Sequence, residues 1–108
     1  MSESIPVVAV VTFPAPPPRS PAETRTLLEQ AGPEYTRIPG LRRKYFMMGE
    51  GEAGGVYEWD SRERAEAFYN DEWYATMSES YGARPTVRIY DSPAIADGNA
   101  GRLEIYLP

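Results

Sequence analysis

The sequence of 108 residues contains neither cysteine nor histidine. Without cysteine there is no disulfide and no thiol nucleophile, and without histidine no Ser-His-Asp triad can be built. Zinc sites made of Cys and His, and haem groups held by His or Cys, are excluded for the same reason. Any catalysis must therefore use carboxylates, phenols, arginine, lysine, hydroxyls, amides, tryptophan or the backbone.

Basic residues and long apolar runs are also scarce. Lysine and arginine number 11 against 16 acidic residues, which gives a formal net charge of −5. Nucleic acids and anionic membranes both need a positive field, so neither is an expected partner. No apolar run approaches the ~20 residues that span a bilayer, and the opening residues MSESIP lack the basic region of a signal peptide. We therefore expect a cytoplasmic protein.

The first third of the chain predicts a strand and then a helix. Residues 5–13, IPVVAVVTF, form a nearly continuous β-branched run, typical of a central strand buried on both faces. Ser20 and Glu23 have the spacing of a capping box around Pro21, which favours a helix start. Gly32-Pro33 is expected to interrupt or kink this helix.

Residues 39–61, PGLRRKYFMMGEGEAGGVYEWDS, predict two strands joined by a glycine-rich turn. The segment 41–48 lacks a helical period, and the segment 56–59 is rich in strand formers. The glycines from Gly49 to Gly55 supply the backbone angles of a hairpin turn, and Gly55 is expected to have a positive φ. Their spacing matches neither GxGxxG nor GxxxxGK[ST], so we expect a turn and no phosphate site.

One basic cluster, Arg42-Arg43-Lys44, lies on the first strand of this hairpin. Alternation along a strand predicts Arg43 on one face and Arg42 with Lys44 on the other, so the cluster does not form one basic surface. Lys44 is the only lysine in the chain. If it is desolvated, its amine could form a Schiff base.

A second helix and a last strand are predicted after the hairpin. Asp60 or Ser61 is expected to cap the helix, with Glu63 closing a box from Asp60, and the helix is expected to run to Tyr81-Gly82. Residues 86–90 predict a fourth strand. The order strand, helix, strand, strand, helix, strand is that of a ferredoxin-like βαββαβ α+β fold, with a four-stranded antiparallel sheet and two helices on one face.

The whole chain, residues 1–108, is expected to form one domain of this kind. A polar link from Asp97 to Gly101 leads to residues 102–107, RLEIYL, whose alternation predicts a short extra strand. We expect this C-terminal tail, residues 97–108, to add a strand at a sheet edge or to be exchanged with a partner subunit.

The combination of PGLRRKYF, GGVYEW and a polar-capped helix resembles the YdhR-like monooxygenases. These belong to the dimeric α+β barrel superfamily, which includes the antibiotic-biosynthesis monooxygenases. The resemblance covers roughly residues 7–97. It implies a homodimer in which the sheet face without helices is covered by a second subunit.

The resemblance also implies a chemistry. The antibiotic-biosynthesis monooxygenases oxidise aromatic, polyketide-like substrates with O₂ and no cofactor, by deprotonating the substrate so that its carbanion reduces oxygen. Trp59 matches the aromatic position that ends their third strand. A histidine often found on their second helix would fall near residues 67–69 and is missing here. No catalytic residue is therefore assigned, and no metal or cofactor is expected.

Aromatic residues concentrate in the hairpin, the second helix and the last strand, where each alone is typical of a core or a dimer interface. Together with arginines they could line a pocket for a small, flat aromatic ligand. The residues predicted to line it are Arg43, Tyr45, Tyr57, Trp59, Trp73, Arg88 and Tyr90. Arg43 or Arg88 is expected to hold a substrate anion. A cyclase or isomerase on the same fold, and a non-catalytic ligand-binding protein, remain open alternatives.

Overall fold

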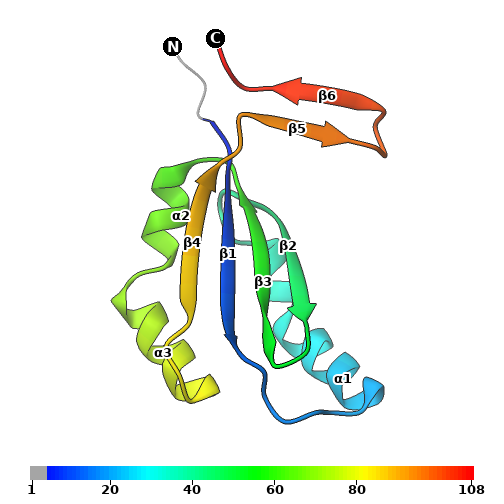
Figure 1. Ribbon diagram of the computed structural model, residues 1–108, viewed down its shortest axis with the longest axis vertical. Helices are drawn as coiled ribbons and strands as arrows, with labels where there is room; N and C mark the ends of the chain where they lie inside the picture. The colour runs from blue at the N-terminus through cyan, green and yellow to red at the C-terminus, as the bar shows by residue number, and fades with distance from the viewer. Residues whose placement is uncertain (1–4) are drawn as a thin grey trace.

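The computed structural model describes residues 5–108, so the first four residues of the predicted domain lie outside this range. A four-stranded antiparallel sheet has the order β2-β3-β1-β4. Its strands are β1 (Val7–Pro14), β2 (Leu41–Met48), β3 (Glu52–Trp59) and β4 (Thr86–Asp91). The helices all lie behind the sheet in Figure 1, which leaves the other face open. The predicted ferredoxin-like α+β fold is confirmed.

Strand β1 occupies the predicted central position, between β3 and β4. Its alternate residues Val7, Ala9 and Val11 are buried under the helices. Val8 and Val10, on the open face, are only half-buried. The prediction of burial on both faces is therefore wrong for the isolated chain, because no element of residues 5–108 covers the open face.

Helix α1 (Pro21–Ala31) begins as predicted, with both capping-box hydrogen bonds. The backbone N–H of Glu23 donates to Ser20 Oγ at 3.1 Å, and that of Ser20 donates to Glu23 Oε1 at 3.0 Å. The predicted interruption at Gly32-Pro33 is also confirmed, because a separate 3₁₀ turn, η1 (Pro33–Thr36), follows there. None of the residues of α1 is buried.

The predicted second helix is two helices, α2 (Arg62–Phe68) and α3 (Asp71–Tyr81). The break occurs because Asn70 begins a new helix: its Oδ1 accepts a hydrogen bond from the backbone N–H of Trp73 at 2.8 Å. At the start of α2 the cap is Ser61, whose Oγ accepts from Arg64 N at 3.3 Å. The box predicted from Asp60 to Glu63 is therefore not the cap.

Strand β3 begins at Glu52, so the two strands meet near Gly51 as predicted, but the turn is shorter than the glycine-rich stretch to Gly55. Gly54 lies inside the strand, where a Cβ atom would come within 1.8 Å of the Val11 carbonyl oxygen. Only glycine permits this approach of β1 to β3. Gly55 does not have a positive φ, so that prediction is wrong.

A β-bulge between Leu41 and Arg43 shifts the register of β2. It turns Arg42 toward the C-terminal segment, where the guanidinium lies 5.9 Å from the centre of the Tyr106 ring. Lys44 lies under the helices, paired with Tyr57. The prediction that Arg42 and Lys44 share a face is wrong because the bulge breaks the alternation.

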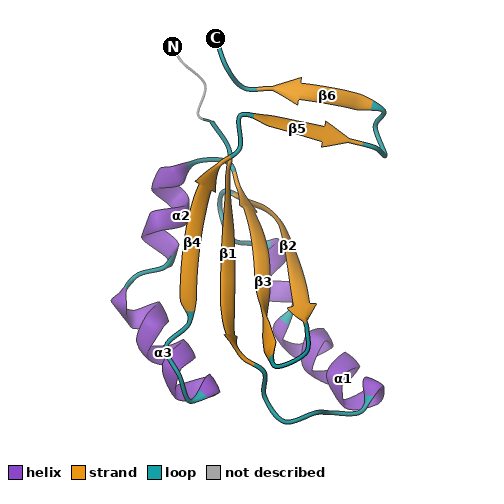
Figure 2. Cartoon of the chain, viewed as in Figure 1, coloured by secondary structure: helices purple, strands orange, loops and turns teal. Residues whose placement is uncertain are grey.

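The C-terminal segment forms a second, two-stranded sheet from β5 (Ala94–Asp97) and β6 (Arg102–Ile105). Figure 2 shows this hairpin at one end of the four-stranded sheet. The predicted extra strand is thus the second strand of a hairpin, and its exchange with a partner remains a prediction. No helix of residues 5–108 is long and apolar enough to cross a membrane.

Candidate functional site

The seven residues predicted to line one pocket lie on opposite faces of the sheet. Tyr57, Trp59 and Trp73 are buried in one cluster between the sheet and the helices. The other four lie on the open face and are exposed: Arg43, Tyr45, Arg88 and Tyr90. The sheet separates the two groups, so within one chain they do not line a common pocket.

The buried group forms an aromatic core. Trp59 is only 1% exposed, and its ring lies 5.2 Å from that of Phe68. Its Nε1–H donates a hydrogen bond to the Tyr69 hydroxyl at 3.1 Å. Burial raises the pKa values of Tyr57 and Tyr69 far above that of a free phenol, so both stay protonated at neutral pH. Trp59 is therefore a core residue whose polar atom already has a partner.

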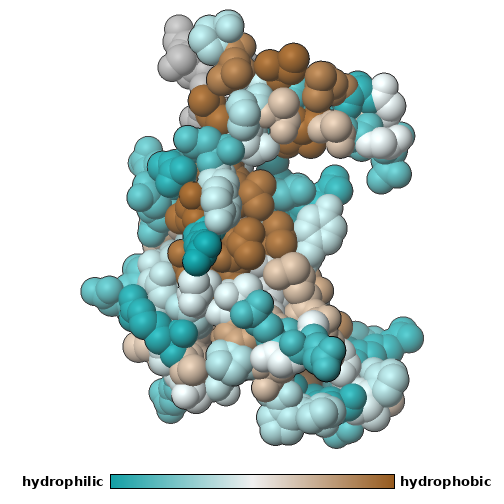
Figure 3. Space-filling view, viewed as in Figure 1, coloured by the Kyte–Doolittle hydropathy of each residue, from teal (hydrophilic) through white to brown (hydrophobic). Residues whose placement is uncertain are grey.

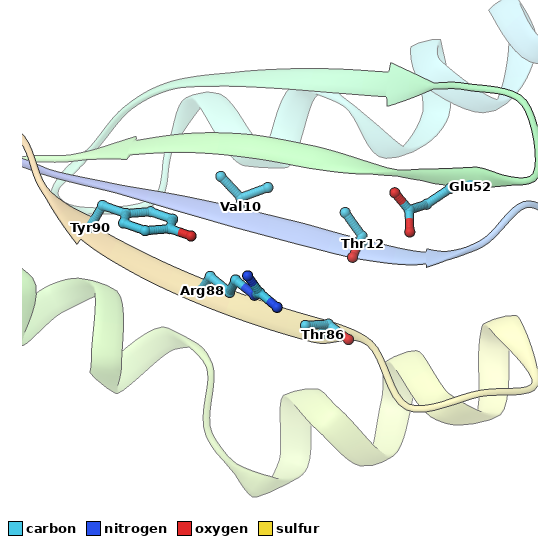
Figure 4. A pocket seen from close by; sticks show the side chains of 6 residues that line it. All are labelled: Val10, Thr12, Glu52, Thr86, Arg88 and Tyr90. Atoms are coloured by element: carbon cyan, nitrogen blue, oxygen red, sulfur yellow. The ribbon is translucent and has the colours of Figure 1, made fainter.

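The open face carries a hollow of about 400 Å³ over β1 and β4 (Figure 4). Its lining residues are Val10, Thr12, Glu52, Thr86, Arg88 and Tyr90. Arg88 and Tyr90 both line this hollow, and both are among the seven residues predicted to form one site. Arg43 and Tyr45 lie elsewhere on this face, where Arg43 donates to the Tyr45 hydroxyl at 3.2 Å and pairs with Glu58 at 3.6 Å.

On the helix side, the residue that the predicted site omitted is Lys44. Its Nζ lies 3.6 Å from the centre of the Tyr35 ring, 4.1 Å from that of Phe46 and 4.6 Å from that of Tyr57. We call Tyr35, Phe46 and Tyr57 the ring cage. They come from η1, β2 and β3, so three elements surround one amine.

Gly55 lies directly beside the side-chain stem of Lys44. A Cβ atom there would meet Lys44 Cε at 3.1 Å, the Tyr45 carbonyl oxygen at 3.1 Å and Tyr57 Cε1 at 3.2 Å. These distances are tighter than ordinary van der Waals contact. The lysine stem therefore lies against bare backbone, and any larger residue at this position would press on it.

Burial of Lys44 favours the uncharged amine. Burial lowers the pKa of Lys44 from its ordinary 10.5 to about 8, although the negative charge of Glu34 acts in the opposite direction. Among the residues that the structure describes, Lys44 forms no salt bridge. Tyr35 and Tyr57 offer no charge either, because burial raises the pKa of both phenols. At pH 7 about a tenth of Lys44 is therefore neutral, against well under a thousandth of an ordinary lysine.

This site can exchange a proton near neutral pH and hold an anion once protonated. Two features of the sequence point to it: Lys44 is the single lysine, and strand alternation assigns it to the face opposite Arg43. No such feature points to Tyr35, which reaches Lys44 from the separate turn η1. Within residues 5–108 no three acidic side chains gather to form a metal site.

No family profile and no curated protein matches the sequence. Solved structures match its fold over most of its length. ActVA-Orf6, a monooxygenase of Streptomyces coelicolor in complex with nanaomycin D, is 21% identical with a TM-score of 0.54, covering 82% of this chain and 88% of that one. A variant of SnoaB, a cofactor-independent oxygenase of Streptomyces nogalater, is 13% identical with a TM-score of 0.55, covering 82% and 94%.

The chain has the ferredoxin-like fold of these oxygenases. A haem-degrading protein of Mycobacterium tuberculosis shares it too, at 18% identity and a TM-score of 0.58, covering 88% of this chain and 99% of that one. At such identities the likeness concerns the fold. The chemistry must be argued from the residues of this chain.

Proposed function

We propose that this protein is a YdhR-like, cofactor-independent monooxygenase that acts on a small aromatic, polyketide-like molecule. The observation that carries the proposal is the position of the Lys44 amine. It lies against three aromatic rings and forms no salt bridge with any carboxylate of the described chain. Oxygenation without a cofactor needs a base to ionise the substrate and a cation to hold its anion. One lysine with a pKa near neutrality supplies both.

The ring cage also suits the substrate class. An exposed aromatic ring, that of Phe46, beside a polar group favours a flat, apolar molecule with an acidic phenol or enol. Phe46 is 44% exposed and Lys44 only half-buried, so a ligand can approach along the β2 edge of the sheet. Arg43 and Arg88, the predicted anion holders, lie on the opposite face and are replaced in this proposal by Lys44.

In the proposed reaction the Lys44 amine accepts a proton from the substrate and becomes an ammonium ion. The ammonium then stabilises the substrate anion, which passes electrons to O₂. One oxygen atom enters the substrate and the other leaves as water. The protonated hydroxyl of Tyr35, which is only half-buried, is the candidate hydrogen-bond donor to reduced oxygen.

The test compares variants at the two candidate sites. Purified protein with a chelator present is titrated with planar polyphenols and anthrones by ligand absorbance, and oxygen uptake is followed with an electrode. Lys44→Met should abolish oxygen uptake above the uncatalysed rate, whereas Arg88→Met, in the open-face hollow, should retain it. Binding and turnover without oxygen uptake would favour the alternative function of a cyclase or isomerase. Binding without any turnover would favour a non-catalytic ligand-binding protein. Oxygen uptake that depends on Arg88 and not on Lys44 would contradict the site.

A homodimer is the expected assembly. Figure 3 shows hydrophobic residues, in brown, over the middle of the open face and along the C-terminal hairpin. On the hairpin, Leu103 and Ile105 are 61% and 63% exposed. Apolar patches of this kind mark interaction surfaces, and a second copy could cover both regions while exchanging the tail. Light scattering should give the dimer mass, and deleting residues 98–108 should weaken it. A monomer at micromolar concentration would contradict the proposal.

A further inference from the structure

The single lysine has surroundings unlike those of a surface ammonium. Its Nζ faces three aromatic rings, its Cε lies over Gly55, and no salt bridge ties it to the described chain. We propose that Lys44 is a nucleophilic amine that forms an imine with an aldehyde or ketone carbonyl on an aromatic ligand. This rests on the site of the proposed function, and it does not depend on the reaction with oxygen.

A lysine must be uncharged to attack a carbonyl, because the lone pair of an ammonium ion is occupied by a proton. Four ionisable groups influence the cage: Glu34 and Tyr35 from η1, Tyr57 from β3 and Tyr81 from α3. Of these only Glu34 is a carboxyl group, and it is exposed on η1. The ring faces attract the ammonium form, whereas burial lowers the pKa of Lys44 and so favours the neutral amine that the reaction needs.

The rings serve the reaction in a second way. An aromatic aldehyde or ketone can pack against Phe46, which is exposed beside the amine, while its carbonyl carbon approaches Nζ from the β2 edge. The phenol of Tyr35 is only half-buried and stays protonated, so it is the candidate proton donor to the carbonyl oxygen. Tyr57 is 3% exposed and contributes only its ring face. The cage thus places a nucleophile, an aromatic surface and an acid together.

Imine formation at Lys44 needs no reactant besides the amine and the carbonyl compound. The nitrogen lone pair forms the N–C bond while the carbonyl π electrons move to oxygen, and a proton passes from nitrogen to that oxygen to give a carbinolamine. A phenol then protonates the departing hydroxyl, water leaves, and the second nitrogen proton returns to the phenolate as the C=N bond forms. Amine and carbonyl become imine and water, and nothing is oxidised or reduced.

The experiment is reductive trapping at pH 7 with 2-hydroxy-1-naphthaldehyde and cyanoborohydride, read by peptide mass spectrometry. Lys44 is the only lysine, so the α-amino group is the only other primary amine and serves as an internal reference. Lys44 in the folded protein should be labelled about 100-fold faster or more than in the urea-unfolded chain, because about a tenth of it is neutral instead of well under a thousandth. The labelling rate of Lys44 in the folded protein should increase with pH, with the midpoint of the increase near pH 8.

Gly55→Ala is the matched variant, because its methyl group would displace the lysine stem while leaving the amine in the chain. It should slow labelling at least 10-fold with an unchanged circular dichroism spectrum, whereas Gly51→Ala, in the open turn, should not. Folded Lys44 that reacts no faster than unfolded Lys44 would overturn the inference. Labelling without oxygen uptake would reject the proposed oxygenation alone, and oxygen uptake without labelling would reject the imine alone.

Discussion

Replacing Tyr69 by phenylalanine tests whether Trp59 belongs to the core or to a binding site. The change removes the hydroxyl that accepts the Trp59 Nε1–H hydrogen bond at 3.1 Å. Trp59 is 1% exposed and Tyr69 8%, so water cannot replace the lost partner. A buried donor left without an acceptor costs about 1–3 kcal/mol. For a domain of this size each kcal/mol lowers the melting temperature by roughly 4–8 °C.

Urea unfolding followed by far-ultraviolet circular dichroism measures this loss without depending on tryptophan emission. Tyr74→Phe is the control, since the Tyr74 hydroxyl makes no hydrogen bond within the described chain, and it should cost less than about 0.5 kcal/mol. Combining Tyr69→Phe with Trp59→Phe should cost less than the sum of the two single changes by about 0.5–1.5 kcal/mol. If Tyr69→Phe were as harmless as Tyr74→Phe, the indole N–H would be free for a ligand and the core assignment would be refuted.

Two further predictions concern the strands and the lysine. Gly54→Ala should cost at least about 2 kcal/mol in urea unfolding because its Cβ would strike β1, whereas Gly51→Ala, at a φ of +77° in open space, should cost only about 1 kcal/mol; equal losses would contradict the close approach. Because the pKa of Lys44 is lower in the folded chain, the folded state binds fewer protons between pH 8 and 10.5, so wild type should gain melting temperature relative to Lys44→Met across that range. A difference that does not change with pH would contradict the lowered pKa.

Local signals in the sequence predicted much of the fold. The Ser20 and Glu23 pair fixed the start of α1, and Gly32-Pro33 ended it, because capping and proline act within a few residues. The break at Asn70 was missed although Asn-Asp-Glu is itself a helix start, since aromatic residues at helical spacing continue through it. The bulge at Arg42 has no comparable signal.

The candidate site was harder to predict because it depends on register. Alternation assigns residues of one strand to two faces, but relating Lys44 to Tyr57 requires the length of the turn between their strands. A turn placed near Gly51 aligns the strands only to within a residue, and a shift of one residue exchanges the two faces. No local sequence pattern shows which sheet face the helices cover. Nor does any show that η1 brings Tyr35 against Lys44, because both features arise from tertiary packing.

The amine of Lys44 is the centre of both proposals, and one measurement addresses it directly. Because the chain has a single lysine, protein labelled with ¹³C and ¹⁵N lysine gives one side-chain signal whose chemical shift reports its protonation. A titration of the folded protein should give a midpoint at about 8, and the urea-unfolded chain should give the ordinary 10.5. A folded midpoint at the ordinary value would show an exposed ammonium ion and contradict the caged amine.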